Sequence, residues 1–348
     1  FIAYYPHPKS CIYKLNSSIM DISQQQPLSD ARVSVVMCTY NGAQFLKEQL
    51  DSILIQTFPI KEIIIQDDSS TDETWDIIQD YAARYDVIRA CRNQTNVGFN
   101  RNFKEAILKA SGEFIAVADQ DDIWYAQKIE RQMQTIGNHD VCISCYHGDR
   151  EFCPGKMKKL SAPHYNLEYL LFYDSTPGHS MLIRSEFARE IFQGWDGHIL
   201  YDWWIAVNAH LNRGLVRVDE ALNWHRPHQG SAITRLNARY ASYMVQKPTW
   251  QPYVTGFTQY RRLQKLDTWN FFYRHIYEHT EGKQHALAHQ ICGLLLKTDP
   301  LSLLRLCSLC MKHKEKVYFN PNQKGMMSYV RSFFYPMIRS YGNTYFYL

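Results

Sequence analysis

An apolar run in the first half of the chain is followed at once by a group of acids. The run covers residues 114–118, and the carboxylates that come directly after it are Asp119, Asp121 and Asp122. Such a run is typical of a buried strand in a parallel sheet, and ligands of open α/β sheets bind outside the carboxyl ends of such strands. Clustered acids repel one another, so we expect a divalent cation, because Mg²⁺ and Mn²⁺ prefer oxygen ligands. The structural alternative is that Ile123 begins a helix and Asp122 caps it.

A further acid stands among aromatic residues later in the chain. Asp202 lies between Tyr201 and Trp203, at the start of a helix predicted to run to about residue 212. The structural explanation is that an acid in the first turn is favoured by the helix dipole. The functional explanation is a general base, which takes a proton from a hydroxyl while a metal ion neutralises a leaving diphosphate. We favour the general base.

Strands and helices must alternate to bring these acids to one place. Strand-type runs at 33–38, 63–65, 87–91 and 114–118 alternate with helical periodicity at 45–54, 72–85 and 98–109. This alternation predicts an α/β fold with a doubly wound, mostly parallel sheet. The carboxyl ends of parallel strands are neighbours, so the polar residues that follow them should converge in one crevice. These residues are Thr39, Tyr40, Asn41, Asp67, Asp68, Asn96, Gly98, Asp119 and Asp121.

Composition and missing motifs exclude several classes of protein. No G-x-G-x-x-G follows the first strand and no G-x-x-x-x-G-K-[ST] occurs, which argues against dinucleotide oxidoreductases and P-loop NTPases. The formal net charge of +4 suits an anionic ligand or membrane surface but is too small to indicate nucleic acid. An odd count of nine scattered cysteines and no secretory signal predict a reducing compartment. No run of about 18 apolar residues occurs, so we expect no membrane-spanning helix.

Four segments resemble a known family. They are VSVVMCTYNGAQFLKEQLDSILIQTF, IIIQDDSSTDET, NVGFNRNF and FIAVADQDDIWYAQKI, in this order over residues 33–131. Together they resemble the family 2 glycosyltransferases of the GT-A fold. The resemblance implies a nucleoside-diphosphate-sugar donor and an inverting transfer to a hydroxyl acceptor. It implies that Tyr40 and Asp68 lie beside the base, and that the other nucleotide contacts are Thr39, Asn41, Asn96 and Gly98.

The same resemblance implies a metal site and a catalytic base. Asp119-Gln120-Asp121 corresponds to the D-x-D metal motif, with Asp121 as the main ligand of Mn²⁺ or Mg²⁺ and Asp119 nearer the ribose or the metal. Asp202 corresponds to the general base, which the family often carries within an E-D or H-D-W-W run. This chain departs from that run, because Tyr201 replaces the acid or histidine that usually precedes the base.

Two further segments have expected roles at the site. The run Trp224-His225-Arg226-Pro227-His228 resembles the Y-R-x-H-G-x-N segment of rhamnosyltransferase-like bacterial enzymes. Arg226 is then a candidate for diphosphate binding, and His228 for a third metal ligand or a phosphate contact. Neutral imidazole suits Mn²⁺ better than Mg²⁺. Acceptor candidates are His179 and Ser180, for which a plain polar turn is an equal alternative, and Trp203, whose ring could stack on a sugar.

We expect three regions along the chain. Residues 1–30 form an N-terminal extension, residues 31–234 a GT-A catalytic domain, and residues 235–348 a helical region without strand patterns. The helical region is rich in aromatic, leucine and basic residues. Its helices pack on the catalytic domain, dock a partner subunit, or lie on an anionic membrane. Because the cysteine count and the lack of a secretory signal predict a reducing compartment, we expect a cytoplasmic protein. Peripheral contact with the inner face of the cell membrane is one option for its helical region.

The expected function is that of an inverting, metal-dependent glycosyltransferase. It would move a sugar from dTDP-rhamnose or a UDP-sugar to a hydroxyl of a saccharide or lipid-linked acceptor in bacterial surface polysaccharide synthesis. One rival is a degenerate GT-A protein that acts as a carbohydrate-binding or scaffolding module, although Asp68, Asp121 and Asp202 are all intact. The other rival is a sugar nucleotidyltransferase, which would release pyrophosphate, but the chain lacks the basic N-terminal loop of such enzymes.

Overall fold

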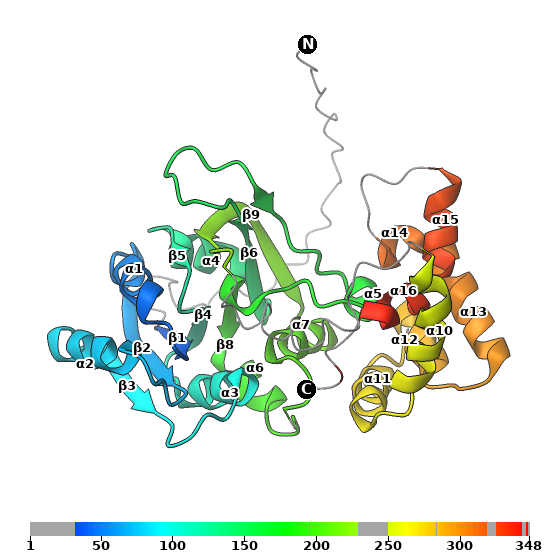
Figure 1. Ribbon diagram of the computed structural model, residues 1–348, viewed down its shortest axis with the longest axis horizontal. Helices are drawn as coiled ribbons and strands as arrows, with labels where there is room; N and C mark the ends of the chain where they lie inside the picture. Colours follow the sequence, from blue (N-terminus) through cyan, green and yellow to red (C-terminus); the bar gives the residue numbers. More distant parts are fainter. Residues whose placement is uncertain are drawn as a thin grey trace, which may run out of the picture.

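A sheet flanked by helices lies beside a region built from helices alone (Figure 1). The computed structural model describes residues 32–195, 197–228, 250–282, 284–318, 325–342 and Phe346. The expected N-terminal extension, residues 1–30, lies outside the described residues. So does the expected boundary between the catalytic and helical regions at residues 234 and 235.

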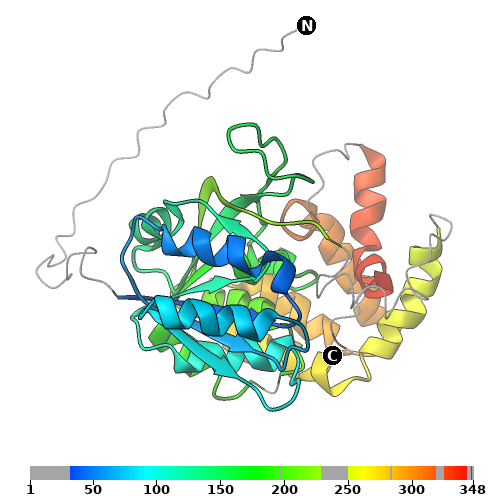
Figure 2. The same cartoon turned by 60° about the vertical axis from the view of Figure 1, so that its left-hand side comes forward.

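The first half of the sheet follows the predicted alternation. Its elements are β1 (Val33–Thr39), α1 (Ala43–Leu54), β2 (Ile60–Asp67), α2 (Thr74–Arg84), β3 (Ile88–Arg92), α3 (Phe99–Lys109) and β4 (Phe114–Ala118). The strand order β3-β2-β1-β4 is parallel throughout, which confirms the expected sheet. Alternate residues of β1 enter two separate cores, with Val35 on the side of α1 and α2 and Val36 on the side of α3. Figure 2 shows α1 and α2 lying over one face of the sheet.

The second half of the sheet mixes strand directions. Its elements are β5 (Ile123–Trp124), α4 (Lys128–Ile136), β6 (Val141–His147), β7 (Leu160–Ser161), α5 (Leu167–Leu170), the short 3-10 turn η2 (Gly178–Ser180), β8 (Met181–Arg184), α6 (Ser185–Ile191), α7 (Tyr201–Leu211) and β9 (Leu215–Trp224). The full order is β3-β2-β1-β4-β8-β6-β9-β5. Strand β8 is antiparallel to both neighbours, whereas β9 is parallel to β6.

The segment after the acids is a strand, so the structural alternative of a helix that begins at Ile123 is excluded. Ile123 pairs with Trp224 and Trp124 with Asn223, antiparallel, and the helix begins only at Lys128. The long strand β9 offers backbone partners that a local sequence pattern does not reveal. Asp122 therefore caps no helix. Instead, the pairing brings it beside the end of β9.

The described part of the C-terminal region is helical, as expected. Its helices are α10 (Gln251–Leu263), α11 (Asp267–His279), α12 (Ala286–Leu295), α13 (Pro300–Lys312), α14 (Lys314–Val317), α15 (Met326–Phe333) and α16 (Tyr335–Gly342). They share one hydrophobic core with α7. The Tyr273 hydroxyl donates a hydrogen bond of 2.6 Å to the Leu171 carbonyl, and Trp203 packs on Phe272 with ring centroids 4.7 Å apart. No described helix has the length and apolar character needed to cross a membrane.

Candidate active site

The ends of β1 and β4 are held together by a glutamine. Met37 pairs with Ala118 in the parallel register, so the residues that follow the two strands are neighbours. The Tyr40 N–H donates to Gln120 Oε1 over 2.9 Å, and Gln120 Nε2 donates back to the Tyr40 carbonyl over 3.2 Å. Gln120, the middle residue of the D-x-D run, thus has a structural role: it links the loop after β4 to the loop after β1. It leaves the side chains of Asp119 and Asp121 available for other roles.

Asp68 organises the loop that borders the expected nucleotide site. Its carboxylate accepts hydrogen bonds from the backbone N–H groups of Val97 and Gly98, over 2.8 and 2.9 Å, and from Asn93 Nδ2 over 2.8 Å. Gly98 has a φ of +84°, which favours glycine because other residues are strained there. Asn96 Nδ2 donates to the Asp68 carbonyl over 3.3 Å. The predicted Asp68, Asn96 and Gly98 therefore do lie together.

The start of α1 is tied to the loop after β2 in the same way. The Asn41 N–H donates to Ser70 Oγ over 2.9 Å, and Asn41 Oδ1 accepts from the Thr71 N–H over 2.8 Å. Thr39 Oγ1 donates to Asp67 Oδ1 over 2.9 Å. The residues expected at the nucleotide all stand at one edge of the sheet, and several of their polar groups already hold the loops in place.

The acids after β4 are buried close to one another. Asp122 is fully buried and Asp121 is nearly so. Burial, followed by repulsion from Asp122 and Asp121, raises the pKa of Asp119 well above its usual range. The charge of His225 lowers the pKa of Asp119 but does not outweigh these effects, so the negative charge is only partly balanced there. The donor set of carboxylate oxygens with nearby imidazoles therefore fits a divalent cation.

His228 reaches the D-x-D run, as the resemblance implied. Its Nε2 lies 2.6 Å from Asp121 Oδ2, and its ring meets the Phe45 ring edge-on with centroids 4.9 Å apart. Asp121 and His228 are thus placed to share one ligand or ion.

Arg226 is held between two aromatic rings. Its guanidinium lies 4.6 Å from the ring centroids of both Phe45 and Trp224. It forms an ion pair with Glu48, and its Nε donates to the Asp121 carbonyl over 2.9 Å. These contacts orient the backbone of Asp121. A diphosphate contact, which the resemblance implied, would have to compete with the Glu48 carboxylate.

A buried network that sequence reasoning missed surrounds Asp122. His225 Nδ1 lies 3.0 Å from Asp122 Oδ1, and Asn223 Nδ2 donates to Asp122 Oδ2 over 3.1 Å. The His179 ring stacks on the His225 ring at 4.7 Å. The ligand atoms of Asp119, Asp122, His179 and His225 all lie within 4.8 Å of one another. This group is a second metal-competent cluster within the crevice.

The two stacked histidines differ in protonation state. Burial disfavours the charged form of His225, but the hydrogen bond and charge of Asp122 outweigh burial and raise its pKa to about 9. Burial, helped by the charge on His225, lowers the pKa of His179 well below its usual range. The stack therefore joins an imidazolium to a neutral imidazole. The H-R-P-H run was the available signal for His225, but only the pairing of β5 with β9 puts it on Asp122.

Asp202 occupies the predicted place at the start of α7. Its Oδ1 accepts from the Trp203 N–H over 2.9 Å and its Oδ2 from the Gly178 N–H over 3.2 Å. Burial raises the pKa of Asp202 to about 6, although these backbone hydrogen bonds oppose the effect. Gly178 can approach because it lacks a side chain: a Cβ there would lie 1.9 Å from the Tyr201 hydroxyl.

A second carboxyl group, which the sequence did not indicate, is hydrogen-bonded to Asp202. Burial and the charge of Asp202 raise the pKa of Asp174 well above its usual range. The hydrogen bond between the two carboxyls also raises the pKa of Asp174 and lowers that of Asp202. Asp174 therefore keeps a proton and donates it to an ionised Asp202. The charges of Asp202 and Asp119 both act on Tyr201, so the two acidic groups belong to one crevice.

The three acceptor candidates, His179, Ser180 and Trp203, lie in the interior of this structure. Trp203 is fully buried and its Nε1 donates to the Leu170 carbonyl over 2.7 Å. Ser180 is fully buried, with its hydroxyl donating to the Pro177 carbonyl over 2.7 Å, and His179 belongs to the network around Asp122. In this conformation they support Asp202 and Asp122.

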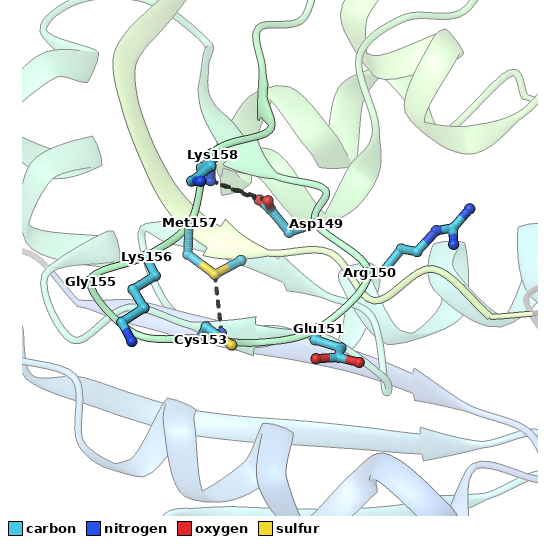
Figure 3. Close-up of a pocket in the computed structure, with 8 residues that line it drawn as sticks. All are labelled: Asp149, Arg150, Glu151, Cys153, Gly155, Lys156, Met157 and Lys158. Atoms are coloured by element: carbon cyan, nitrogen blue, oxygen red, sulfur yellow. Dashed lines mark hydrogen bonds between the residues drawn. The ribbon is translucent and has the colours of Figure 1, made fainter.

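The surface pocket drawn in Figure 3 is formed by the loop between β6 and β7. Within this loop the Asp149 carboxylate accepts from the N–H groups of Lys158 and Lys159, the shorter bond being 2.9 Å. Trp224 Nε1 donates to the Asp149 carbonyl over 2.9 Å. The loop thus holds Trp224 in place by a hydrogen bond, and the Arg226 guanidinium packs on the ring of Trp224. The loop contributes none of the candidate ligands.

Comparison with known proteins agrees with this fold. The family described as Glycosyl transferase family 2 matches residues 34–197. The crystal structure of TarS 1–349 from S. aureus in complex with UDP-GlcNAc superposes with a TM-score of 0.51 at 19% identity, covering 82% of this chain and 81% of that chain.

Two curated relatives match over shorter segments. An uncharacterized protein of Mycobacterium tuberculosis (strain ATCC 25618 / H37Rv) is 39% identical over 119 residues, 33% of this chain and 34% of that protein. TuaG of Bacillus subtilis (strain 168), a glycosyltransferase named for teichuronic acid biosynthesis, is 35% identical over 112 residues, 32% of this chain and 44% of that protein. The chain thus spans less than half the length of either relative. The family match and the shared fold together show that residues 34–197 form a family 2 glycosyltransferase domain and that the chain has a GT-A fold.

Proposed function

We propose that this chain is an inverting, metal-dependent glycosyltransferase that uses a nucleoside-diphosphate-sugar. One observation carries the proposal: two groups of carboxylates with different properties meet at one edge of the sheet. Asp121 with His228 has the donor set of a cation site. Asp202, whose pKa is raised to about 6, has a pKa suited to a general base near neutral pH.

The donor would lie across the ends of β1, β2 and β4. Tyr40 and Asp68 would border its base, with Thr39, Asn41, Asn96 and Gly98 around the nucleotide and Arg226 towards the diphosphate. The neighbour TarS is described in complex with UDP-GlcNAc. For this chain we propose a donor of the same chemical class, with dTDP-rhamnose or a UDP-sugar as the leading candidates from the sequence resemblance.

Asp121, Asp119 and His228 would hold Mn²⁺ or Mg²⁺. The fit rests on the raised pKa of Asp119, which indicates negative charge without a sufficient partner. When bound, the cation would offset the charge that develops on the leaving diphosphate. The protein's own part is to keep the carboxylates in position, through the hydrogen bonds of Gln120 and the hydrogen bond from Arg226 to the Asp121 carbonyl.

The chemical step needs one proton acceptor. Asp202 would take the proton of an acceptor hydroxyl as its oxygen attacks the anomeric carbon from the face opposite the nucleotide. The new glycosidic C–O bond forms, the C–O bond to the diphosphate breaks, and the nucleoside diphosphate leaves with the bonding electrons. Asp174, which keeps its own proton, would hold Asp202 ionised and oriented through the carboxyl–carboxyl hydrogen bond.

The acceptor would be a hydroxyl of a saccharide or of a lipid-linked saccharide in bacterial polysaccharide synthesis. Support comes from the likeness to the B. subtilis relative named for teichuronic acid biosynthesis. The acceptor must approach Asp202 from the solvent side of the crevice, because Trp203 and Ser180 are buried behind it.

Nucleotide binding gives the first test. Thermal unfolding would be followed with dTDP, UDP and GDP, each with and without Mn²⁺. A nucleotide at 100 times its dissociation constant should stabilise the fold by roughly 2.7 kcal/mol. We expect one nucleotide to stabilise the protein only when the metal is present. The absence of any shift would favour a degenerate scaffold instead.

Product analysis then separates the enzyme classes. With the donor selected by the binding test, a glycosyltransferase releases a nucleoside diphosphate, whereas a sugar nucleotidyltransferase consumes or releases pyrophosphate. Slow hydrolysis of the donor without an acceptor would suffice, because the diphosphate is the product in either case. Pyrophosphate as the product would overturn the proposal.

A further inference from the structure

Helix α15 buries two of its small polar side chains and exposes four of its large apolar side chains. Ser328 and Ser332 are buried and bond to the backbone of their own turn. Met326 is 82% exposed and Met327 54% exposed, and Tyr329 and Val330 are exposed as well. We call these four side chains the α15 face. A helix on the surface of a globular protein normally has the opposite arrangement.

The α15 face belongs to a region that concentrates exposed apolar surface. Ten of the fourteen large apolar side chains that are exposed among the described residues lie between residues 250 and 342. That segment holds fewer than a third of the described residues. Scattered exposed apolar residues need no explanation, but a concentration of them marks an interaction surface.

The same region carries the positive charge of the protein. Residues 250–342 contain 13 lysines and arginines against 5 acids, a formal charge of +8. The whole chain has a formal charge of +4, so the remaining residues sum to −4. A surface with anionic groups would therefore attract the helical region and repel the remainder, which orients the molecule.

Basic side chains stand next to the α15 face. Helix α14 packs against α15, and Lys314 Nζ lies 4.8 Å from the centroid of the Tyr329 ring. Lys312 and Lys316, at the end of α13 and in α14, are exposed. Helix α15 contains Arg331 and no acid. Apolar side chains beside lysine and arginine are the pattern of helices that lie in the surface of an anionic bilayer.

We propose that the α15 face docks this protein onto the surface of an anionic phospholipid bilayer. Met326, Met327 and Val330 enter the boundary between headgroups and acyl chains, Tyr329 lies at headgroup level, and the neighbouring lysines meet the phosphates. A second copy of this chain is a less favoured partner for the α15 face. Self-association through this face would bring together two regions that each carry a formal charge of +8. The proposal does not depend on the transfer reaction proposed above.

Vesicle sedimentation tests the proposal with the full chain. We expect the protein to sediment with phosphatidylglycerol vesicles, to remain free with phosphatidylcholine vesicles, and to be released from the anionic vesicles by salt. The variant with Met326→Ser and Met327→Ser should lower the partition coefficient by about tenfold or more, because two apolar side chains are lost. The matched control is Ile55→Ser, since Ile55 is 65% exposed at the end of α1, and it should leave partitioning unchanged.

A charge variant provides an independent measure. Lys312→Gln with Lys316→Gln should lower partitioning about thirtyfold, because each basic residue near an anionic surface contributes roughly fivefold. Lys47→Gln, an exposed lysine of α1, is the matched control. All these positions are exposed, and equal melting temperatures would confirm that the variants fold.

Three outcomes would overturn the proposal. The first is equal binding to both kinds of vesicle, and the second is no binding to either. The third is a concentration-dependent dimer in sizing experiments that the Met326→Ser and Met327→Ser variant abolishes while vesicle binding is unaffected. That result would assign the face to a second copy of the chain.

Discussion

The crevice at the strand ends and the helical region depart from ordinary packing in opposite ways. In the crevice, acids and imidazoles are buried: Asp122 has no exposed surface, and burial, followed by repulsion from Asp122 and Asp121, raises the pKa of Asp119. In the helical region, the side chains of Met326 and Met327 are exposed while Ser332 is buried. Each arrangement costs stability locally. Places where a sequence breaks the rule of apolar inside and polar outside are the places to look for a ligand.

The charges of the two regions complete this contrast. The helical residues 250–342 carry a formal charge of +8, and the remaining residues carry −4. The acids of the crevice are disposed to hold a cation, whereas the basic residues around α15 are disposed to meet an anionic surface. Substitutions in one region should therefore leave the proposed function of the other intact.

The largest expected effect is on the proposed base. Asp202→Asn should lower kcat by about 1,000-fold, because the amide cannot accept the acceptor proton. Metal-dependent nucleotide binding and vesicle binding should both persist. Rates would be measured as release of nucleoside diphosphate, with the exposed Asp86→Asn as the matched control. Normal turnover by the Asp202 variant would remove the base assignment.

The next effect concerns the cation site. Asp121→Ala should weaken nucleotide binding in the presence of Mn²⁺ by about 100-fold, because the principal carboxylate ligand is lost. The affinity without metal should stay as in the unaltered protein, which serves as the internal control. Isothermal titration with the selected nucleotide provides both values. An unchanged affinity with Mn²⁺ would show that the metal, if bound, lies elsewhere, and the cluster of Asp122 and His225 would become the first alternative.

A smaller effect, on the pH dependence of kcat/KM, distinguishes the roles of Asp202 and Asp174. Because the base acts in its ionised form and its pKa is raised to about 6, kcat/KM should fall as the pH drops through 6, by about tenfold per unit below that value. Asp174→Leu removes the donor that lowers the pKa of Asp202, so the acid limb should move to higher pH. Asp174→Asn retains a donor and should move it less.

The charged groups around Asp202 include others that bear on this experiment. Asp119 and Tyr201 interact electrostatically with it. The Asp174→Leu profile should therefore be compared with that of Asp174→Asn rather than with the unaltered protein alone. Identical acid limbs in the two variants would contradict the role of the carboxyl–carboxyl hydrogen bond.

The smallest effect tests the contact between the two regions. Tyr273→Phe removes the hydroxyl that donates to the Leu171 carbonyl, a few residues before Asp174. We expect a loss of about 1 kcal/mol in the free energy of unfolding, measured with urea. Nucleotide affinity should not change, and kcat should fall by a small factor. A large loss of nucleotide affinity would show that the regions are coupled more tightly than their separate charges indicate.

The alternating strands and helices of the first half of the sheet could be predicted from the local pattern of apolar residues. The apolar runs that became β1, β2, β3 and β4 and the helices between them are where periodicity predicted them. The reason is physical: each of these elements buries a face defined by its own residues, so the period of the apolar positions already specifies the element. Asp202 at the start of α7 was likewise predictable, because its helix begins where the helical spacing begins.

Pairing between distant segments was not predictable in this way. Ile123 and Trp124 have no local mark of a strand, and they form β5 only because β9 passes beside them. The consequence is large, since this pairing excludes the alternative of a helix cap and puts Asp122 at the centre of a network with His225 and Asn223. Likewise, Asp174 gains a role only because its carboxyl is folded against Asp202.

The class of fold, the edge of the sheet at which the acids gather and the candidate base could therefore be predicted from the chain's local patterns. The hydrogen bond between Asp174 and Asp202, the differing protonation of His179 and His225, and the burial of the acceptor candidates became visible only in the folded arrangement. The difference has one physical cause. Secondary structure follows from the spacing of apolar residues along the chain, whereas charge state and exposure depend on groups that are remote in sequence and close in space.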